Sequence, residues 1–123
     1  MRILLIDDDP LLIEALPPAL ARRLPQSNIT TALCPQDGLH HLEHAPFDVV
    51  ITDLLMSGMR GDELTSRIKN LAQRVPVILI TGVPESPGEV LPAHLFAVVR
   101  KPFDIAELVQ TIVAAAGSRD SAS

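Results

Sequence analysis

At 123 residues the chain suits a single domain with one hydrophobic core, and a composition rich in Leu, Ile, Val and Ala with 2% aromatic residues favours parallel strands covered by helices over a β-sandwich. The formal net charge of −5 and the lack of a basic run argue against direct nucleic-acid binding, and no apolar stretch approaches the ~20 residues of a membrane span. The single cysteine excludes an intrachain disulfide and, with an N-terminus that lacks a signal-peptide pattern, predicts a cytoplasmic protein.

The first part of the chain alternates apolar runs with helical patterns. The run Ile3–Ile6 predicts a buried strand, and Asp9 followed by Pro10 predicts a helix start with an acidic N-cap and proline at the first helical position. Pro17 and Pro18 lie inside this helical pattern and predict a kink or break, because each removes a backbone donor. Two weaker elements follow, an edge strand over Asn28–Leu33 and a short helix over Pro35–Ala45.

The centre of the chain combines a buried strand with a charged end. Val49–Ile51 is an unbroken apolar run, and Asp53 follows it before a glycine-containing loop. An acid at the carboxyl end of a buried strand, on a loop that leads to a helix, stands where open α/β sheets place their chemistry.

The remaining predicted elements are a helix from Gly61 or Asp62 to about Gln73, a strand over Pro76–Thr81, a short or irregular helix at most within Gly82–Pro92, a strand over Leu95–Val99 and a final helix capped by Asp104.

The order of these elements predicts the architecture. Strands alternate with helices five times, which is typical of an open parallel sheet with right-handed crossovers and helices on both faces. We expect one domain over residues 1–117, with residues 118–123 as a C-terminal tail or the start of a linker.

Polar residues stand at the ends of four predicted strands, namely Asp7, Asp8, Asp53, Thr81 and Lys101. The carboxyl ends of parallel strands meet at one edge, so these side chains are expected to converge. Carboxylates ~4 Å apart repel by roughly 4 kcal/mol per pair at an effective dielectric near 20, and one lysine leaves a cluster of three at −2. Mg²⁺ takes oxygen ligands and would balance that charge. The pattern therefore predicts phosphoryl chemistry, with Asp53 or another of the acids as the nucleophile.

The motifs also occur in a familiar order. IDD, ITD with MSGMRG, ILITG and RKPF follow one another as in the receiver domain of two-component response regulators, and the chain resembles this family, of which the chemotaxis regulators are members, from Arg2 to about Ala116. The resemblance implies a doubly wound, (βα)5, flavodoxin-like three-layer sandwich with strand order 2-1-3-4-5.

The resemblance also implies roles for individual residues. Asp53 corresponds to the phosphoacceptor, Thr81 to the switch hydroxyl and Lys101 to the lysine that contacts the phosphoryl group. The implied ligands of Mg²⁺ or Mn²⁺ are Asp7, Asp8, Asp53 and the backbone carbonyl of Leu55. In the family the bond equivalent to Lys101–Pro102 is usually cis. Val98 stands where the family often has an aromatic switch residue, which departs from the pattern.

The function implied by the resemblance is that of a signalling domain. A sensor histidine kinase or a phosphotransfer domain would donate the phosphoryl group, and an output domain or target protein would read the change. Such a domain catalyses only its own phosphorylation and autodephosphorylation, and a phosphorylation-dependent dimer is common in the family.

Two other functions remain open from the sequence. A phosphohydrolase similar to the haloacid dehalogenase superfamily would use Asp7 as nucleophile and Asp9 as acid, but Leu11 replaces an expected threonine and Asp53 would have no role. A phosphorylation-independent interaction module is the third reading, and the complete set of site residues disfavours it.

The histidines of the second predicted helix suggest a separate metal site. His40 and His44 lie one helical turn apart, a spacing that zinc sites use. No third ligand is evident from the sequence, so we interpret them as part of a solvated helix face.

Overall fold

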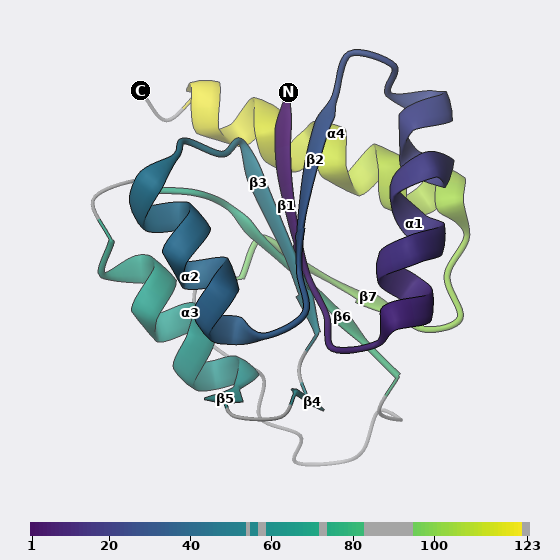
Figure 1. The fold of residues 1–123 in the computed structure, drawn as a ribbon. Helices are drawn as coiled ribbons and strands as arrows, with labels where there is room; N and C mark the ends of the chain where they lie inside the picture. The colour runs from purple at the N-terminus through teal and green to yellow at the C-terminus, as the bar shows by residue number, and fades with distance from the viewer. Residues whose placement is uncertain (54, 57–58, 72–73, 83–94, 122–123) are drawn as a thin grey trace, which may run out of the picture.

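A computed structural model of the chain describes residues 1–123 except residues 54, 57–58, 72–73, 83–94 and 122–123 (Figure 1). The strands are β1 (Arg2–Ile6), β2 (Asn28–Ala32), β3 (Val49–Asp53), β4 (Leu55–Met56), β5 (Met59–Arg60), β6 (Val77–Thr81) and β7 (Ala97–Arg100). The helices are α1 (Pro10–Arg23), α2 (Pro35–His44), α3 (Gly61–Lys69) and α4 (Ile105–Ser121).

Five parallel strands form the main sheet in the spatial order β2-β1-β3-β6-β7 (Figure 1). β4 and β5 form a separate antiparallel pair, so β6 and β7 are the fourth and fifth strands of the sheet and the predicted order 2-1-3-4-5 is confirmed. In the register of neighbouring strands, Asp53 lies beside Ile80 and Thr81 lies beside Arg100. The polar ends of the strands therefore reach the same edge of the sheet.

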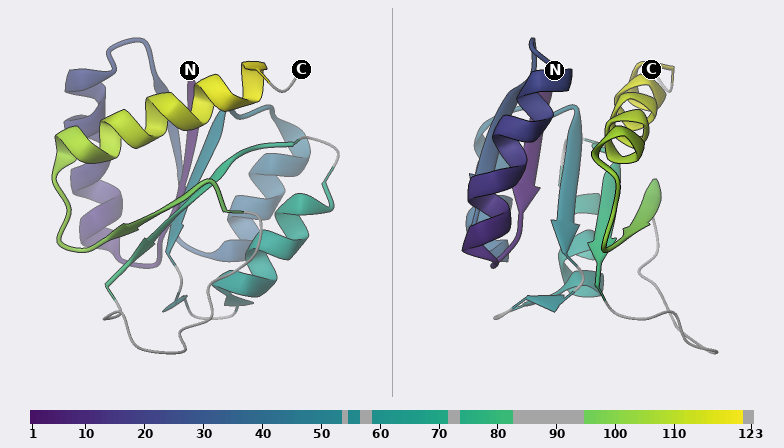
Figure 2. Two further views of the ribbon diagram at one scale, coloured as in Figure 1. Left: turned by 180° about the vertical axis from the view of Figure 1, so that it is seen from behind. Right: turned by 90° about the vertical axis from the view of Figure 1, so that its right-hand side faces the viewer.

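The sheet separates two apolar cores, because successive side chains of a strand point to opposite faces. Under α1 and α4 the core consists of Ile3, Leu5, Leu16, Leu20, Val49, Ile51, Ile78, Ile80, Val99, Leu108, Ile112 and Ala115. Under α2 and α3 it consists of Leu4, Ile6, Ala32, Leu39, Leu42, Phe47, Val50, Leu64, Ile68 and Val77. Seen from behind, α4 lies in front of the strands (Figure 2). The expected three-layer sandwich is confirmed.

Burial along the strands follows their position in the sheet. β6 is buried throughout, and β1 and β3 are buried at all but one end residue. β2 carries the less apolar sequence NITTA and is mostly half-buried, as predicted for an edge strand. β7 lies at the opposite edge and is also mostly half-buried. Uninterrupted apolar runs therefore occupy the middle of the sheet, where both faces are covered.

Pro17 and Pro18 do not break the helix, because α1 continues through both prolines to Arg23; the alternative of a kink at this place stays a prediction. Leu16 and Leu20 flank the pair and are buried in the core on the α1 face. This packing on both sides keeps the helix together despite two missing backbone donors, so tertiary contacts outweigh the local preference.

Other element limits also differ from the predictions. α3 ends at Lys69 instead of near Gln73, since the amide of Asn70 donates to the carbonyls of Ser66 (3.3 Å) and Arg67 (3.2 Å), which closes a tighter last turn. α4 extends past Gly117 to Ser121. The domain limit at residue 117 stays a prediction. The helix considered within Gly82–Pro92 falls almost wholly on residues 83–94, outside the described part of the chain.

The buried face of α4 is expected to contribute strongly to stability. Ile112 is fully buried, whereas its neighbour Val113 is 48% exposed. Ile112→Ala should lower the free energy of unfolding by about 2–5 kcal/mol, while Val113→Ala should change it by no more than about 0.5 kcal/mol. Both substitutions replace a β-branched residue with alanine in the same helix, so urea unfolding of the pair isolates the effect of burial. Equal changes would contradict this packing.

Candidate functional site

The loops at the carboxyl edge of the sheet gather the polar residues singled out in the sequence. Asp7 follows β1, Asp53 ends β3, Thr81 ends β6 and Lys101 follows β7. After β1 the chain crosses to β2 on one side of the sheet, whereas the next sheet strand after β3 is β6, on the other side. Open α/β sheets place their binding sites at such a point, and the two aspartates stand on either side of it.

Lys101 joins the two acids. Its Nζ lies 3.2 Å from Oδ2 of Asp53 and 3.6 Å from Oδ2 of Asp7. The backbone amide of Lys101 donates to the carbonyl of Thr81 at 2.8 Å, which ties the lysine to the end of β6. The Lys101–Pro102 peptide bond is cis, as expected. One ammonium group is therefore shared between two carboxylates from different strands.

The Asp7 carboxylate is the most buried charge of the site. Its Oδ1 accepts a hydrogen bond from the amide of Asp9 at 2.9 Å. Its Oδ2 is buried without a hydrogen-bond donor among the described residues, and its ion pair with Lys101 is longer than a good hydrogen bond. Burial raises the pKa of the Asp7 carboxyl above its ordinary value of 3.8. The negative charges of Asp53 and Asp8 raise this pKa further, and the Asp9 amide and Lys101 only partly oppose the rise.

The pKa of Lys101 shows how the acids stabilise its charge. Burial by itself would lower this pKa, but the hydrogen bond to Asp53 and the charges of Asp7 and Asp53 outweigh burial and raise it above 10.5. Lys101 is therefore fully protonated at neutral pH. It remains partly accessible, with 28% of its side chain exposed.

The acidic groups at this edge fit a hard divalent cation. The cluster contains the buried, hydrogen-bond-deficient Oδ2 of Asp7, the 15% exposed carboxylate of Asp53 and the exposed Asp8. All of these donors are oxygens, which Mg²⁺ prefers. A cation beside Oδ2 of Asp7 would satisfy the buried oxygen and offset the repulsion between neighbouring carboxylates. Leu55 lies in β4, opposite Arg60 of β5, and the use of its carbonyl as a ligand stays a prediction.

The structure thus brings together most of the predicted residues. Lys101 contacts both Asp7 and Asp53, and Thr81 is fully buried and bonded to the lysine through its backbone. Asp9 is a helix cap, as predicted, because its Oδ1 accepts a hydrogen bond from the amide of Leu11 at 3.0 Å. The bond from its amide to Asp7 was missed, since a backbone donor leaves no residue-specific signal.

Two further positions bear on the switch. Val98 is half-buried in β7 beside Leu79, in the position where an aromatic residue was considered. Phe96 precedes the strand and is 41% exposed.

No helix among the described residues combines the length and apolar character that a bilayer crossing requires.

The comparisons with known proteins agree with this geometry. The sequence model of the response regulator receiver domain matches residues 3–113. The transcriptional regulatory protein GlrR of Escherichia coli is 33% identical over 112 residues, which cover 89% of this chain and 25% of that protein. The heme response regulator HssR of Staphylococcus epidermidis is 32% identical over 114 residues, which cover 90% of this chain and 49% of that protein. The chain thus spans between a quarter and a half of these relatives.

Solved structures share the fold over nearly the whole chain. A CheY-like receiver domain protein from Methanospirillum hungatei JF-1 superposes with a TM-score of 0.87 at 23% identity, covering 99% of this chain and 98% of that one. A receiver domain protein from Clostridium thermocellum gives a TM-score of 0.84 at 25% identity, with the same coverage. With the strand order and the match over residues 3–113, these comparisons show that the chain belongs to the response regulator receiver domain family.

Proposed function

We propose that Asp53 is the phosphoacceptor of this receiver domain and takes its phosphoryl group from a phosphohistidine of a sensor kinase or a phosphotransfer domain. The observation that carries this proposal is the contact of the Asp53 carboxylate with Lys101, 3.2 Å away at the carboxyl edge of the sheet. The carboxylate is 15% exposed, so a donor can reach it, and its partner lysine carries a full positive charge.

The reaction that we propose is a direct displacement at phosphorus. A carboxylate oxygen of Asp53 forms the new P–O bond while the P–N bond to the donor imidazole breaks, and the imidazole nitrogen keeps the electron pair. The ammonium group of Lys101, which now contacts two carboxylates, would shift toward the negative oxygens of the phosphoryl group. The Thr81 hydroxyl would donate to one of these oxygens.

Asp7, Asp8, Asp53 and the backbone carbonyl of Leu55 are the proposed ligands of Mg²⁺ or Mn²⁺. When bound, the metal would neutralise charge on the phosphoryl oxygens. Asp7 is positioned for this role by the hydrogen bond from the Asp9 amide, which leaves Oδ2 without a hydrogen-bond donor among the described residues. An exposed Asp8 is accessible to the water molecules that such a metal retains.

The biological setting follows from this chemistry. We propose a cytoplasmic phosphorelay in which the domain catalyses only its own phosphorylation and dephosphorylation and signals to an output domain or a target protein. A phosphohydrolase centred on Asp7 would need Asp9 as its acid, but the carboxylate of Asp9 caps α1. It would also leave the contact between Asp53 and Lys101 without a purpose.

Chemical phosphorylation tests the proposal directly. The protein should acquire one acid-stable, base-labile phosphoryl group when it is incubated with acetyl phosphate and Mg²⁺, and borohydride reduction with peptide mapping should place it on Asp53. Removal of Mg²⁺ with EDTA should prevent the labelling. Turnover of phosphate esters that depends on Asp7 would instead support the hydrolase. The absence of both labelling and turnover would support an inert interaction module.

A further inference from the structure

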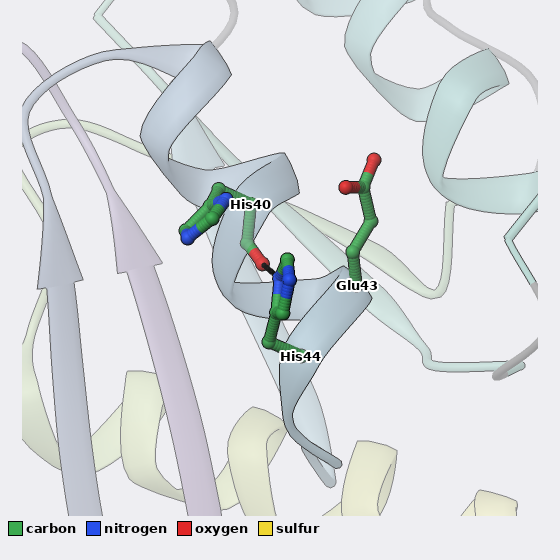
Figure 3. Close-up of side chains that lie close together, drawn as sticks. All are labelled: His40, Glu43 and His44. Carbon is green, nitrogen blue, oxygen red and sulfur yellow. Dashed lines mark hydrogen bonds between the residues drawn. The ribbon is translucent and has the colours of Figure 1, made fainter.

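A second group of side chains of the types that ligate metals lies in the C-terminal half of α2. His40, Glu43 and His44 are all exposed, and one ligand atom from each lies within 4.8 Å of the others (Figure 3). The sequence spacing had indicated the two histidines, and the structure supplies Glu43 as the third ligand. We propose that this cluster binds a divalent transition metal ion of the zinc type.

The orientation of His44 favours ligation. Its Nδ1 lies 2.8 Å from the backbone carbonyl oxygen of His40 (Figure 3). A carbonyl oxygen only accepts, so Nδ1 carries the proton and Nε2 of the neutral ring keeps its lone pair. Metal-binding histidines commonly donate their second nitrogen to a carbonyl, which fixes the tautomer and the ring orientation. This contact therefore provides the supporting hydrogen bond that such a ligand needs.

The distances require only side-chain adjustment. The imidazole rings of His40 and His44 already have their centroids 4.3 Å apart. Ligand atoms about 2.05 Å from a tetrahedral zinc ion are about 3.3 Å from one another. All three side chains are exposed, so the side chains of His40 and Glu43 have room to rotate toward His44 and close the remaining gap. The fourth coordination position would be left to water.

The location and the donor types select the metal. The cluster lies at the C-terminal end of α2, where the carbonyl dipoles favour a cation. Two imidazole nitrogens and one carboxylate suit Zn²⁺, Ni²⁺ or Cu²⁺, whereas Mg²⁺ prefers an all-oxygen site. α2 begins after the carboxyl end of β2 and runs back toward the start of β3, so the cluster stands away from the Asp53 edge. The two sites are therefore chemically and spatially distinct.

Titration of the full chain with ZnCl₂ in a buffer free of other ligands tests this proposal. Calorimetry should show one site, and replacing either histidine by His40→Ala or His44→Ala should weaken binding by at least about tenfold. Glu43→Gln should weaken it less than either histidine substitution, because two nitrogen ligands remain. His41→Gln is the matched control, since it removes a histidine of the same helix that is not part of the cluster, and Asp53→Asn controls for the other edge; both should bind zinc within about twofold of the original chain.

Copper spectroscopy gives an independent readout. The electron paramagnetic resonance spectrum of the Cu²⁺-loaded protein should show coupling to two imidazole nitrogens, and His44→Gln, with α2 intact by circular dichroism, should reduce this to one. The proposal would be overturned if His41→Gln weakened zinc binding as much as His40→Ala or His44→Ala. The absence of zinc binding in the original chain, or binding that disappears only with Asp53→Asn, would also overturn it.

Discussion

Replacing Asp53 by asparagine is expected to abolish phosphorylation by acetyl phosphate and by any cognate kinase. The amide has no anionic oxygen to attack phosphorus, and it keeps nearly the same shape, so the loss would report chemistry instead of folding. Phosphate-affinity electrophoresis of the treated protein should show no shifted species, and peptide mapping should find no modified aspartate.

Asp37→Asn is a suitable control for this experiment. Asp37 is exposed in the first turn of α2, so its loss removes one negative charge elsewhere on the surface. This variant should become phosphorylated as fast as the original chain. Retained labelling in Asp53→Asn, on Asp7 or Asp8, would show that another acid is the nucleophile and would refute the assignment of Asp53.

Asp7→Asn is expected to impair phosphorylation and to stabilise the fold at the same time. The proposed site would lose its most buried metal ligand, and bound metal supplies several kcal/mol of charge stabilisation, so the rate of Mg²⁺-dependent labelling should fall at least about a hundredfold. In EDTA, the substitution removes a buried carboxylate whose pKa is raised, and the free energy of unfolding should increase by about 0.5–2 kcal/mol.

The stability difference between Asp7→Asn and the original chain should depend on pH. Because the pKa of Asp7 in the folded chain lies above 3.8, the native state binds more protons than the unfolded state at pH values between 3.8 and that folded pKa. The contribution of Asp7 to stability is therefore complete below pH 3.8 and is lost as the pH rises through its folded pKa. The stability advantage of Asp7→Asn in EDTA should grow over the same interval and then level off.

Saturating Mg²⁺ should reduce the difference in free energy of unfolding between Asp7→Asn and the original chain. A cation beside the carboxylate would stabilise the original chain by preferential binding to the native state, while the asparagine variant would gain less. Urea unfolding curves with EDTA and with Mg²⁺ measure both effects. A variant that is less stable than the original chain in EDTA at neutral pH would contradict the view that the Asp7 charge is costly.

The sequence predicted the sheet and the convergence at its edge because both depend on simple regularities. Apolar runs identify buried strands, and parallel pairing places every carboxyl end on one side. Asp7, Asp53 and Lys101 stand directly at these ends, so topology alone brings them close. The roles of Thr81 and of the Leu55 carbonyl stay predictions, since they rest on the resemblance to the family.

The sequence-based predictions failed or were incomplete where tertiary packing or backbone hydrogen bonds determine the structure. Two adjacent prolines, Pro17 and Pro18, predict a break only if the helix is considered alone, and the burial of Leu16 and Leu20 reverses that outcome. The bond from the Asp9 amide to Asp7 does not follow from residue type, because it depends on the course of the backbone. The proximity of Glu43 to the histidines was overlooked, although Glu43 follows His40 by three residues in the predicted helix and such residues share a helix face.

The chain moves to opposite sides of the sheet order after β1 and after β3, and this has a consequence for the two outer layers of the molecule. β1 continues into α1 in one outer layer, whereas the chain after β3 reaches α3 in the other. Both connections begin at the edge of the sheet that holds Asp7 and Asp53. Proteins that contact α1 and proteins that contact α3 would therefore bind opposite outer layers of the domain, and each of these helices follows a loop that starts at the edge holding Asp7 and Asp53.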